Sequence, residues 1–268
     1  MKYRLLVSDV DGTLVDTQKQ LTPATIDAVA RVRAAGVAFT VISARPRSGV
    51  VPIGEALAIN GPMAAFNGGT IFHRDGRVDV QHVVDPAVAR GVIAMATDVD
   101  IWVFADDQWF ASTDQGAHVG SERKAANQEP VVRRDFADLL DRADKITFVS
   151  DTPAVLNALH ARIEADFAGR ATVALSQPYY LDVTALEANK GAGVAALATA
   201  FGMPLAEVAA IGDQANDLPM LACVGLAIAM GNAPDHVQAA AAHVTAANTA
   251  DGVALAIDTL ILPALEFA

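Results

Sequence analysis

Two carboxylates stand two residues apart near the N-terminus, in the segment DVDGT that begins at Asp9. The apolar residues 5–7 come before them and predict a buried strand that ends where the acids begin. Because residues i and i+2 of a strand point the same way, Asp9 and Asp11 can face one pocket. Close carboxylates repel each other unless a cation lies between them, so the pair indicates a divalent metal, with one acid as nucleophile and the other moving a proton. A strand that ends in an ordinary Asp-Gly turn is the alternative.

Two further polar residues stand at a predicted strand end and a predicted helix start. Ser43 follows the apolar residues 39–42, and its hydroxyl and the next backbone N–H can hold a phosphate oxygen. A simple turn residue is the alternative there. Lys190 opens a helix, where the helix dipole disfavours a cation. It is either a solvated lysine or a cation held over a nucleophile to neutralise phosphate charge.

A fourth polar site is the segment GDQAND at residues 212–217, after the predicted strand 208–211. Oxygen side chains this close together suit a hard cation such as Mg²⁺, although an Asx-rich turn would have the same composition. Ligands of open α/β sheets bind at the carboxyl ends of the strands, so the four sites together indicate metal-assisted phosphoryl transfer. The sequence has no Walker loop GxxxxGK[ST], which disfavours a nucleotide kinase or P-loop ATPase.

The elements that must position these residues alternate between apolar strands and helices at both ends of the chain. Such strands indicate a parallel sheet covered on both faces, with residues 62–66 as the third strand after 5–8 and 37–43. The middle of the chain has a different predicted order of helices and strands, αββαβαββ. The sequence therefore predicts an α/β fold with a Rossmann-like, doubly wound parallel sheet core, residues 1–82 and 187–268. An inserted α+β cap domain is predicted at residues 83–186.

Composition narrows the possible partners and the compartment. The chain has 31 acidic against 19 basic residues, a net charge of −12 and no basic block, which disfavours a nucleic-acid partner. We expect no membrane association, because no signal peptide is evident and the longest apolar stretch, residues 218–230, is interrupted by Pro219 and Gly225. The single Cys223 cannot form an intrachain disulfide. These features predict a cytoplasmic protein, and no protein partner is evident.

The four polar sites resemble the motifs of the haloacid dehalogenase (HAD) superfamily, and within it the Cof-type phosphatases with a type IIB cap. The matching segments are DVDGT from Asp9, ISARP around Ser43, NKG around Lys190 and GDQANDLPM from Gly212. FNGG at 66–69, MGNA at 230–233 and residues 243–254 extend the similarity. One departure is Ala44, where the family often has Gly, and a methyl there could shift the backbone N–H that meets phosphate.

The resemblance implies a role for each core residue. Asp9 would be the nucleophile that forms an aspartyl-phosphate, and Asp11 would protonate the leaving alcohol and later activate water. The implied phosphate-binding residues are Ser43, Ala44, Lys190 and Asn216. The implied ligands of Mg²⁺ are Asp9, the backbone carbonyl of Asp11, and Asp213. The implied supporting residues are Thr13 and Asp217.

The cap should close over the site and read the leaving group. Our candidate substrate contacts are Arg45, His118 and Arg123, with Arg47, Glu122 and Lys124 as further candidates. Each of these side chains has the alternative interpretation of an ordinary solvated surface residue.

The expected function is a Mg²⁺-dependent phosphatase that hydrolyses small phosphomonoesters through an aspartyl-phosphate, with sugar phosphates as the expected substrates. The partner would be a small phosphorylated metabolite. By the resemblance, Asp11 separates this chemistry from that of dehalogenases, which lack the second acid, and P-type ATPases, which carry Thr there. A phosphomutase of the phosphomannomutase type and a non-catalytic phospholigand sensor are the alternatives. The intact charged residues disfavour a sensor, because buried charges are costly to keep.

Overall fold

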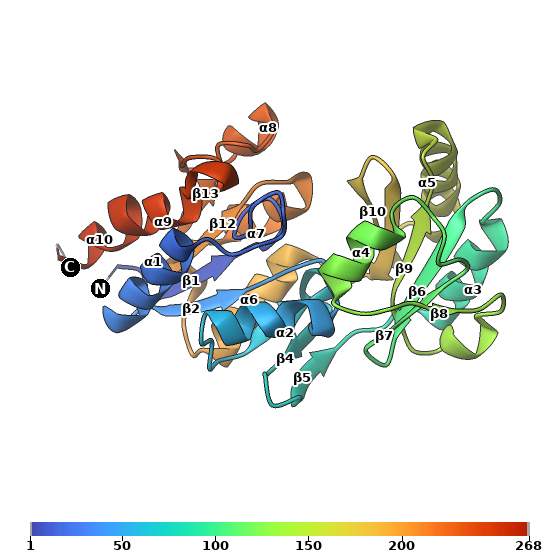
Figure 1. The fold of residues 1–268 in the computed structure, drawn as a ribbon, viewed down its shortest axis with the longest axis horizontal. Coiled ribbons are helices and arrows are strands. Elements are labelled where there is room, and N and C mark those ends of the chain that lie inside the picture. The colour runs from blue at the N-terminus through green and yellow to red at the C-terminus, as the bar shows by residue number, and fades with distance from the viewer. Residues whose placement is uncertain (1, 267–268) are drawn as a thin grey trace.

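Five parallel strands form the sheet that carries the N-terminal carboxylates. The computed structural model describes residues 2–266 and gives this sheet the order β14-β13-β12-β1-β2 (Figure 1). The strands are β1 Leu5–Ser8, β2 Ala38–Val41, β12 Val208–Gly212, β13 Leu226–Ala229 and β14 His243–Val244. Leu5 of β1 is in register with Val208 on one side and Ala38 on the other. The acids after β1 therefore lie beside the loop that follows β12, far away in the sequence.

Helices cover both faces of this sheet. Leu6 of β1 joins a hydrophobic cluster with Val29 of α1, whereas Leu5 and Val7 join a second cluster with Val194 of α6. This alternation confirms the predicted doubly wound α/β core. The helices are α1 Pro23–Ala34, α2 Arg47–Ala56, α6 Lys190–Ala200, α7 Leu218–Cys223, α8 Asp235–Gln238, α9 Gly252–Ala256 with the π-helical turn Ile257–Ile261, and α10 Pro263–Glu266.

The third predicted strand forms, and its pairing matches the expectation in part. β3 (Met63–Ala65) meets the parallel sheet through one parallel bridge, between Ile42 and Ala64, as expected for a third parallel strand. It pairs antiparallel with β4 (Thr70–Phe72), which pairs antiparallel with β5 (Val78–Gln81). A short apolar run fixes the existence of a strand but not its neighbour. The helix α2 forms after β2 although Pro52 and two glycines lower its helical propensity.

A six-stranded sheet occupies the middle of the chain, in the order β10-β11-β9-β6-β7-β8. Its pairs are antiparallel except for β7 with β8. The strands are β6 Asp100–Ala105, β7 Gln108–Ala111, β8 Val131–Val132, β9 Ala143–Val149, β10 Ala171–Gln177 and β11 Tyr180–Ala185. The helices are α3 Pro86–Met95, α4 Val119–Ala126 and α5 Pro153–Phe167. The α+β character predicted for the cap is thus present, with α4 and β8 added to the expected elements.

The two faces of the cap sheet have different partners. On one face Val103 and Ile146 pack in a cluster with residues of α3 and α5. On the other face Trp102 and Phe104 join the same cluster as core residues, and the rings of Phe104 and Phe66 lie 5.9 Å apart between centroids. The face of the cap sheet that α3 and α5 do not cover therefore turns toward the core, as Figure 1 shows.

Two connections link the core with the cap sheet, one after β5 and the other between β11 and α6. We propose domain boundaries within them, at residues 82/83 and 186/187; residues 1, 267 and 268 of the proposed core lie outside the described part of the chain. Across residues 2–266, no helix has both the length and the apolar character needed to traverse a bilayer.

Candidate active site

Asp9 extends β1 by one residue and is buried at its carboxyl end. Its backbone N–H donates to the carbonyl of Ile211 at 2.9 Å, which holds it against β12. Gly12, with φ of +81°, turns the chain so closely past Asp213 that a Cβ there would lie 2.4 Å from Asp213 Oδ2. Thr13 Oγ1 donates to Asp213 Oδ1 at 2.9 Å. The DVDGT segment thus needs its glycine in order to bring the acids of two strands together.

Lys190 joins these acids from the start of α6. Asn189 caps the helix by accepting a hydrogen bond from the backbone N–H of Ala192 at 3.0 Å. The buried Lys190 Nζ donates to Asp9 Oδ1 at 2.5 Å and to Asp217 Oδ1 at 2.6 Å. Burial lowers the pKa of Lys190, but the charges of Asp217 and Asp9 outweigh this effect and hold the pKa above its ordinary value. The lysine therefore carries a positive charge against the Asp9 carboxylate.

Asp9, Asp213 and Asp217 form a cluster of oxygen donors, with one carboxylate oxygen of each within 4.8 Å of the others. Asp217 is held rigidly, because its Oδ2 accepts from the backbone N–H of Asp213 at 2.8 Å and of Gln214 at 2.9 Å. Burial and then the Asp217 charge raise the pKa of Asp213 to about 6. Burial also raises the pKa of Asp9, against the opposing effect of Lys190. Three buried acids share one lysine, so a divalent cation would offset the remaining negative charge.

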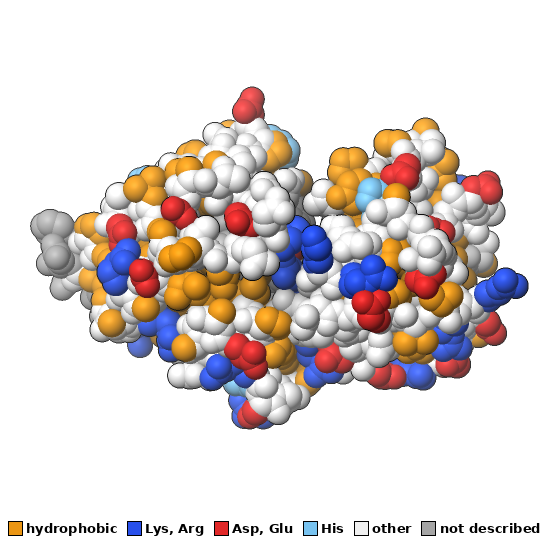
Figure 2. Space-filling view, viewed as in Figure 1, with side chains coloured by type: hydrophobic (Ala, Val, Ile, Leu, Met, Phe, Trp, Pro, Cys, Tyr) orange, Lys and Arg blue, Asp and Glu red, His pale blue; other side chains and the backbone are white. Residues whose placement is uncertain are grey.

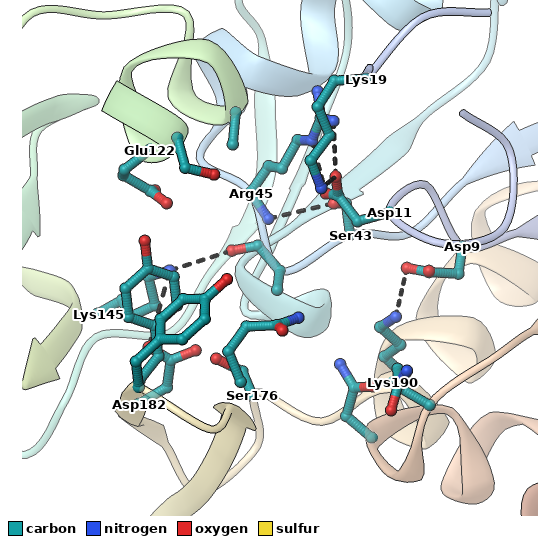
Figure 3. A pocket seen from close by; sticks show the side chains of 18 residues that line it. Asp9, Asp11, Lys19, Ser43, Arg45, Glu122, Lys145, Ser176, Asp182 and Lys190 are labelled. Carbon is teal, nitrogen blue, oxygen red and sulfur yellow. Dashed lines mark hydrogen bonds and ion pairs between the residues drawn. The ribbon is translucent and has the colours of Figure 1, made fainter. Parts of the chain in front are cut away.

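Asp11 faces the other way and is held by two cations (Figure 3). Arg45 donates from Nε to Asp11 Oδ2 at 2.7 Å and from Nη2 to Oδ1 at 2.8 Å. Lys19 Nζ donates to Oδ1 at 2.5 Å. Burial raises the pKa of Asp11, but the hydrogen bonds and charges of Arg45 and Lys19 outweigh it, so the pKa lies well below its ordinary value. Asp11 is therefore an ionised carboxylate in this arrangement.

The predicted phosphate-binding residues lie around the same space. Ser43 is buried, with its backbone N–H donated to Ala64 O at 3.0 Å, and its Oγ accepts from the backbone N–H of Arg45 at 3.2 Å. Asn216 Nδ2 donates to Asn67 Oδ1 at 3.3 Å. Ser43 and Asn216 line the same cavity as Asp9 and Lys190, as does Ala44.

This cavity of about 230 Å³ lies between the core and the cap. The space-filling view shows the hollow between the two halves of the molecule, with Lys and Arg side chains at its edge (Figure 2). Its floor is formed by the core residues described above, together with Lys19 and Gln214. Its cap side is lined by Ser121, Glu122, Ala125, Lys145, Ser176, Gln177, Tyr179, Tyr180 and Asp182.

The structure divides the candidate substrate contacts into two groups. Arg45 and Glu122 line the cavity. His118 instead stacks on Tyr179, with ring centroids 3.7 Å apart, and its Nε2 lies 2.6 Å from Asp151 Oδ1. Three others lie outside the cavity lining: Arg123 pairs with Glu129, Arg47 with Asp107, and Lys124 is exposed. We therefore do not carry these outlying side chains into the proposed substrate contacts.

Several cavity residues were missed in the sequence. Lys145 and Asp182 are buried charged residues within the apolar strands β9 and β11. A charge inside an apolar strand is a signal that could have identified both of them, because such charges are seldom buried without a role. Lys19 offered no comparable signal, since it stands in a polar loop.

The geometry combines a buried carboxylate, a lysine hydrogen-bonded to it, an acidic cluster and a cavity covered by the cap. The profile of the haloacid dehalogenase-like hydrolases matches residues 6–257. The chain belongs to this family. It is an HAD phosphatase, a hydrolase that acts on phosphoric monoesters.

Relatives of this HAD protein span nearly its whole length. It is 27% identical to the pyridoxal phosphate phosphatase YbhA of Escherichia coli, over 95% of this chain and 97% of that protein. A haloacid dehalogenase-like hydrolase from Bacteroides thetaiotaomicron is 28% identical, with a TM-score of 0.88 over 97% of this chain and 100% of the other. The HAD subclass IIB sugar phosphatase BT4131 shares the fold at 23% identity, with a TM-score of 0.82 over 95% and 98% of the two chains. The predicted superfamily and type IIB cap are confirmed.

Proposed function

We propose that this HAD protein is a Mg²⁺-dependent phosphatase that hydrolyses small phosphomonoesters, foremost sugar phosphates, through an aspartyl-phosphate at Asp9. The observation that carries the proposal is the buried contact of Lys190 with Asp9 at the floor of the capped cavity. A charged lysine there can neutralise an incoming phosphate dianion while leaving the second oxygen of the carboxylate to attack.

The acidic cluster suits Mg²⁺ in the type and the number of its donors. Asp9 and Asp213 offer carboxylate oxygens, the backbone carbonyl of Asp11 would complete the protein ligands, and Asp217 orients the set through its bonds to Lys190 and to the backbone. When bound, Mg²⁺ would polarise the phosphoryl group and reduce the repulsion between it and Asp9.

In the proposed first step, an Asp9 carboxylate oxygen attacks phosphorus and the bond from phosphorus to the leaving oxygen breaks. Lys190, Ser43 and Asn216 hold the phosphoryl oxygens, while Asp11 gives its proton to the leaving alcohol. Asp11 then takes a proton from water, which attacks phosphorus and frees Asp9. The negative charge of an arriving phosphate offsets the charges of Arg45 and Lys19, which raises the pKa of Asp11 and lets it take up the proton that it gives to the leaving alcohol, while Arg45 keeps Asp11 in place.

The cavity favours a small, polar leaving group. At about 230 Å³ it is closed above by polar and aromatic cap side chains, which suit hydroxyl groups and the apolar faces of sugar rings. Pyridoxal phosphate is a second substrate to test, because the related Escherichia coli phosphatase bears that name. We place the protein in the cytoplasm, with a small phosphorylated metabolite as its partner.

Phosphate release from a panel of hexose phosphates, pyridoxal phosphate and p-nitrophenyl phosphate tests the proposal. We expect turnover with Mg²⁺, its loss in EDTA and its return when Mg²⁺ is restored. Turnover that is indifferent to EDTA would remove the metal from the mechanism. Conversion of a hexose phosphate to its isomer without release of phosphate would indicate a mutase, and binding without any reaction would indicate a sensor.

A further inference from the structure

The cap side of the cavity contains an acidic side chain that the reaction does not use. Glu122 projects from α4 into the cavity and is only 8% exposed (Figure 3). The charges that lower its pKa come from Lys145 and Arg45, and hydrogen bonds are not among the causes of its shift. Its pKa is raised first by burial, and the charge of Lys145 opposes that effect. The carboxylate faces the cavity, so a ligand there can donate hydrogen bonds to it in place of water.

A second acid, Asp182, and a lysine, Lys145, also lie on the cap side of the cavity near Glu122. Asp182 is 4% exposed, and its Oδ1 accepts from Thr147 Oγ1 at 2.6 Å. Lys145 Nζ lies 4.0 Å from that same oxygen and donates to the backbone carbonyl of Ala44 at 3.4 Å. In the described structure Asp182 Oδ2 has no hydrogen-bond donor.

The cap side of the cavity therefore carries two carboxylates against one ammonium, with acceptor oxygens left over. Such a surface attracts groups that donate hydrogen bonds and repels a second anion, because like charges repel strongly in a site with little water between them. The core cations Lys19, Arg45 and Lys190 face the phosphate of the substrate. Selection by charge on the cap side therefore concerns only the leaving group.

We propose that Glu122 and Asp182 form a subsite that selects leaving groups by charge, taking polyhydroxylated groups that are neutral or carry an ammonium, and rejecting those with a carboxylate or a second phosphate. This inference rests on the proposed phosphatase function and specifies its substrate class.

Three hexose derivatives of nearly equal size separate the charge effect from shape. Glucosamine 1-phosphate carries an ammonium, glucose 1-phosphate is neutral in its sugar, and glucuronic acid 1-phosphate carries a carboxylate, and all three are pyranose rings. We expect kcat/KM to fall in that order, by about tenfold or more from the first to the last, since tenfold corresponds to about 1.4 kcal/mol. Equal or faster hydrolysis of glucuronic acid 1-phosphate than of glucose 1-phosphate would overturn the proposal.

Variants assign the effect to the two acids. Glu122→Gln and Asp182→Asn keep the shape of each side chain and remove its charge, so each should bring the three kcat/KM values closer together. The matched control is Glu129→Gln, on an exposed cap glutamate that pairs with Arg123, and it should leave the ratios unchanged. Ratios that stay fixed in both Glu122→Gln and Asp182→Asn would contradict the assignment, and having two variants covers the case in which one fails to fold.

Binding separates this inference from the proposed function. The three compounds are titrated calorimetrically into the Asp9→Asn protein, which cannot form the phosphorylated carboxylate. The predicted order of affinity without any turnover by the wild-type protein would support the subsite and reject the phosphatase. Turnover of p-nitrophenyl phosphate by the wild type, with a reversed order of affinity, would reject the subsite and retain the phosphatase.

Discussion

Arg45 holds Asp11 through two parallel hydrogen bonds, from Nε to one carboxylate oxygen and from Nη2 to the other. The guanidinium is buried, so this bidentate pair fixes the plane of the carboxylate that we propose exchanges a proton with the leaving oxygen. The pair places the proposed acid and base at the edge of the cavity rather than in the acidic cluster beside Lys190.

Replacing this arginine should impair turnover more than substrate binding. Arg45→Lys keeps the charge but loses the planar fork, so Asp11 is no longer held in one orientation. We expect kcat to fall about 10- to 100-fold with a smaller change in KM, measured by steady-state phosphate release. The matched control is Arg31→Lys, which breaks a similar bidentate pair with Asp258 on the surface. An equal loss of kcat in Arg45→Lys and Arg31→Lys would contradict a positioning role for Arg45.

Removal of Lys190 should destabilise the core. Lys190→Met leaves the buried Asp9 and Asp217 without their shared cation, and breaking a buried pair in this way costs about 3–5 kcal/mol. Urea unfolding in EDTA measures the change in the free energy of unfolding. The control is the exposed Lys124, whose replacement by Met should change this free energy by less than about 0.5 kcal/mol. An unchanged midpoint for Lys190→Met would contradict the buried ion pair.

Asp144 should make stability depend on pH. Burial raises the pKa of this side chain to about 6, although Gln81 Nε2 donates to it at 2.7 Å and opposes the shift. The folded protein binds the proton more tightly than the unfolded chain, so this contribution to stability is present at acidic pH and is lost as pH rises from about 4 to 6.

Asp144→Asn tests that dependence, since the Asn side chain keeps the acceptor for Gln81 and has no proton to lose. We expect the variant to be more stable than the wild type at pH 7, by about 2–3 kcal/mol, with the difference vanishing near pH 4. Urea unfolding at several pH values measures it. Parallel curves for the two proteins would show that Asp144 does not titrate in this range.

Closure of the cap depends on a glycine at its contact with the core. A Cβ on Gly49 of α2 would lie 2.0 Å from the carbonyl oxygen of Ala125 in α4. Gly49→Val should therefore hold α4 away from α2 and lower kcat/KM about tenfold or more, because the cap residues no longer meet the substrate. The control is Gly120→Ala in α4, where a Cβ has no neighbour within 4 Å. A fully active Gly49→Val enzyme would contradict this contact.

The sequence predicted the site residues of the core better than those of the cap. Asp9, Ser43 and Asp213 each follow an apolar run, and the parallel topology then requires them to meet. The cap offered no such rule. Which face of the β10–β11 hairpin meets the cavity depends on tertiary contacts, so Asp182 was overlooked.

The local errors in the fold have a similar cause. β3 is a three-residue strand, which is too short for its composition to choose between a parallel and an antiparallel neighbour. The helix α4 begins without a side-chain cap and contains Gly120, so its sequence gives little helical signal. That helix carries Glu122, which was a candidate from its residue type and does line the cavity.

The identity of the phosphorylated residue tests the central claim most directly. The enzyme is mixed with substrate and Mg²⁺, quenched in acid within the first turnover, digested and examined by mass spectrometry. The account predicts one added phosphoryl group on the peptide that contains Asp9, and none in Asp9→Asn. A phosphoryl group on another residue, or phosphate release by Asp9→Asn at the wild-type rate, would contradict it.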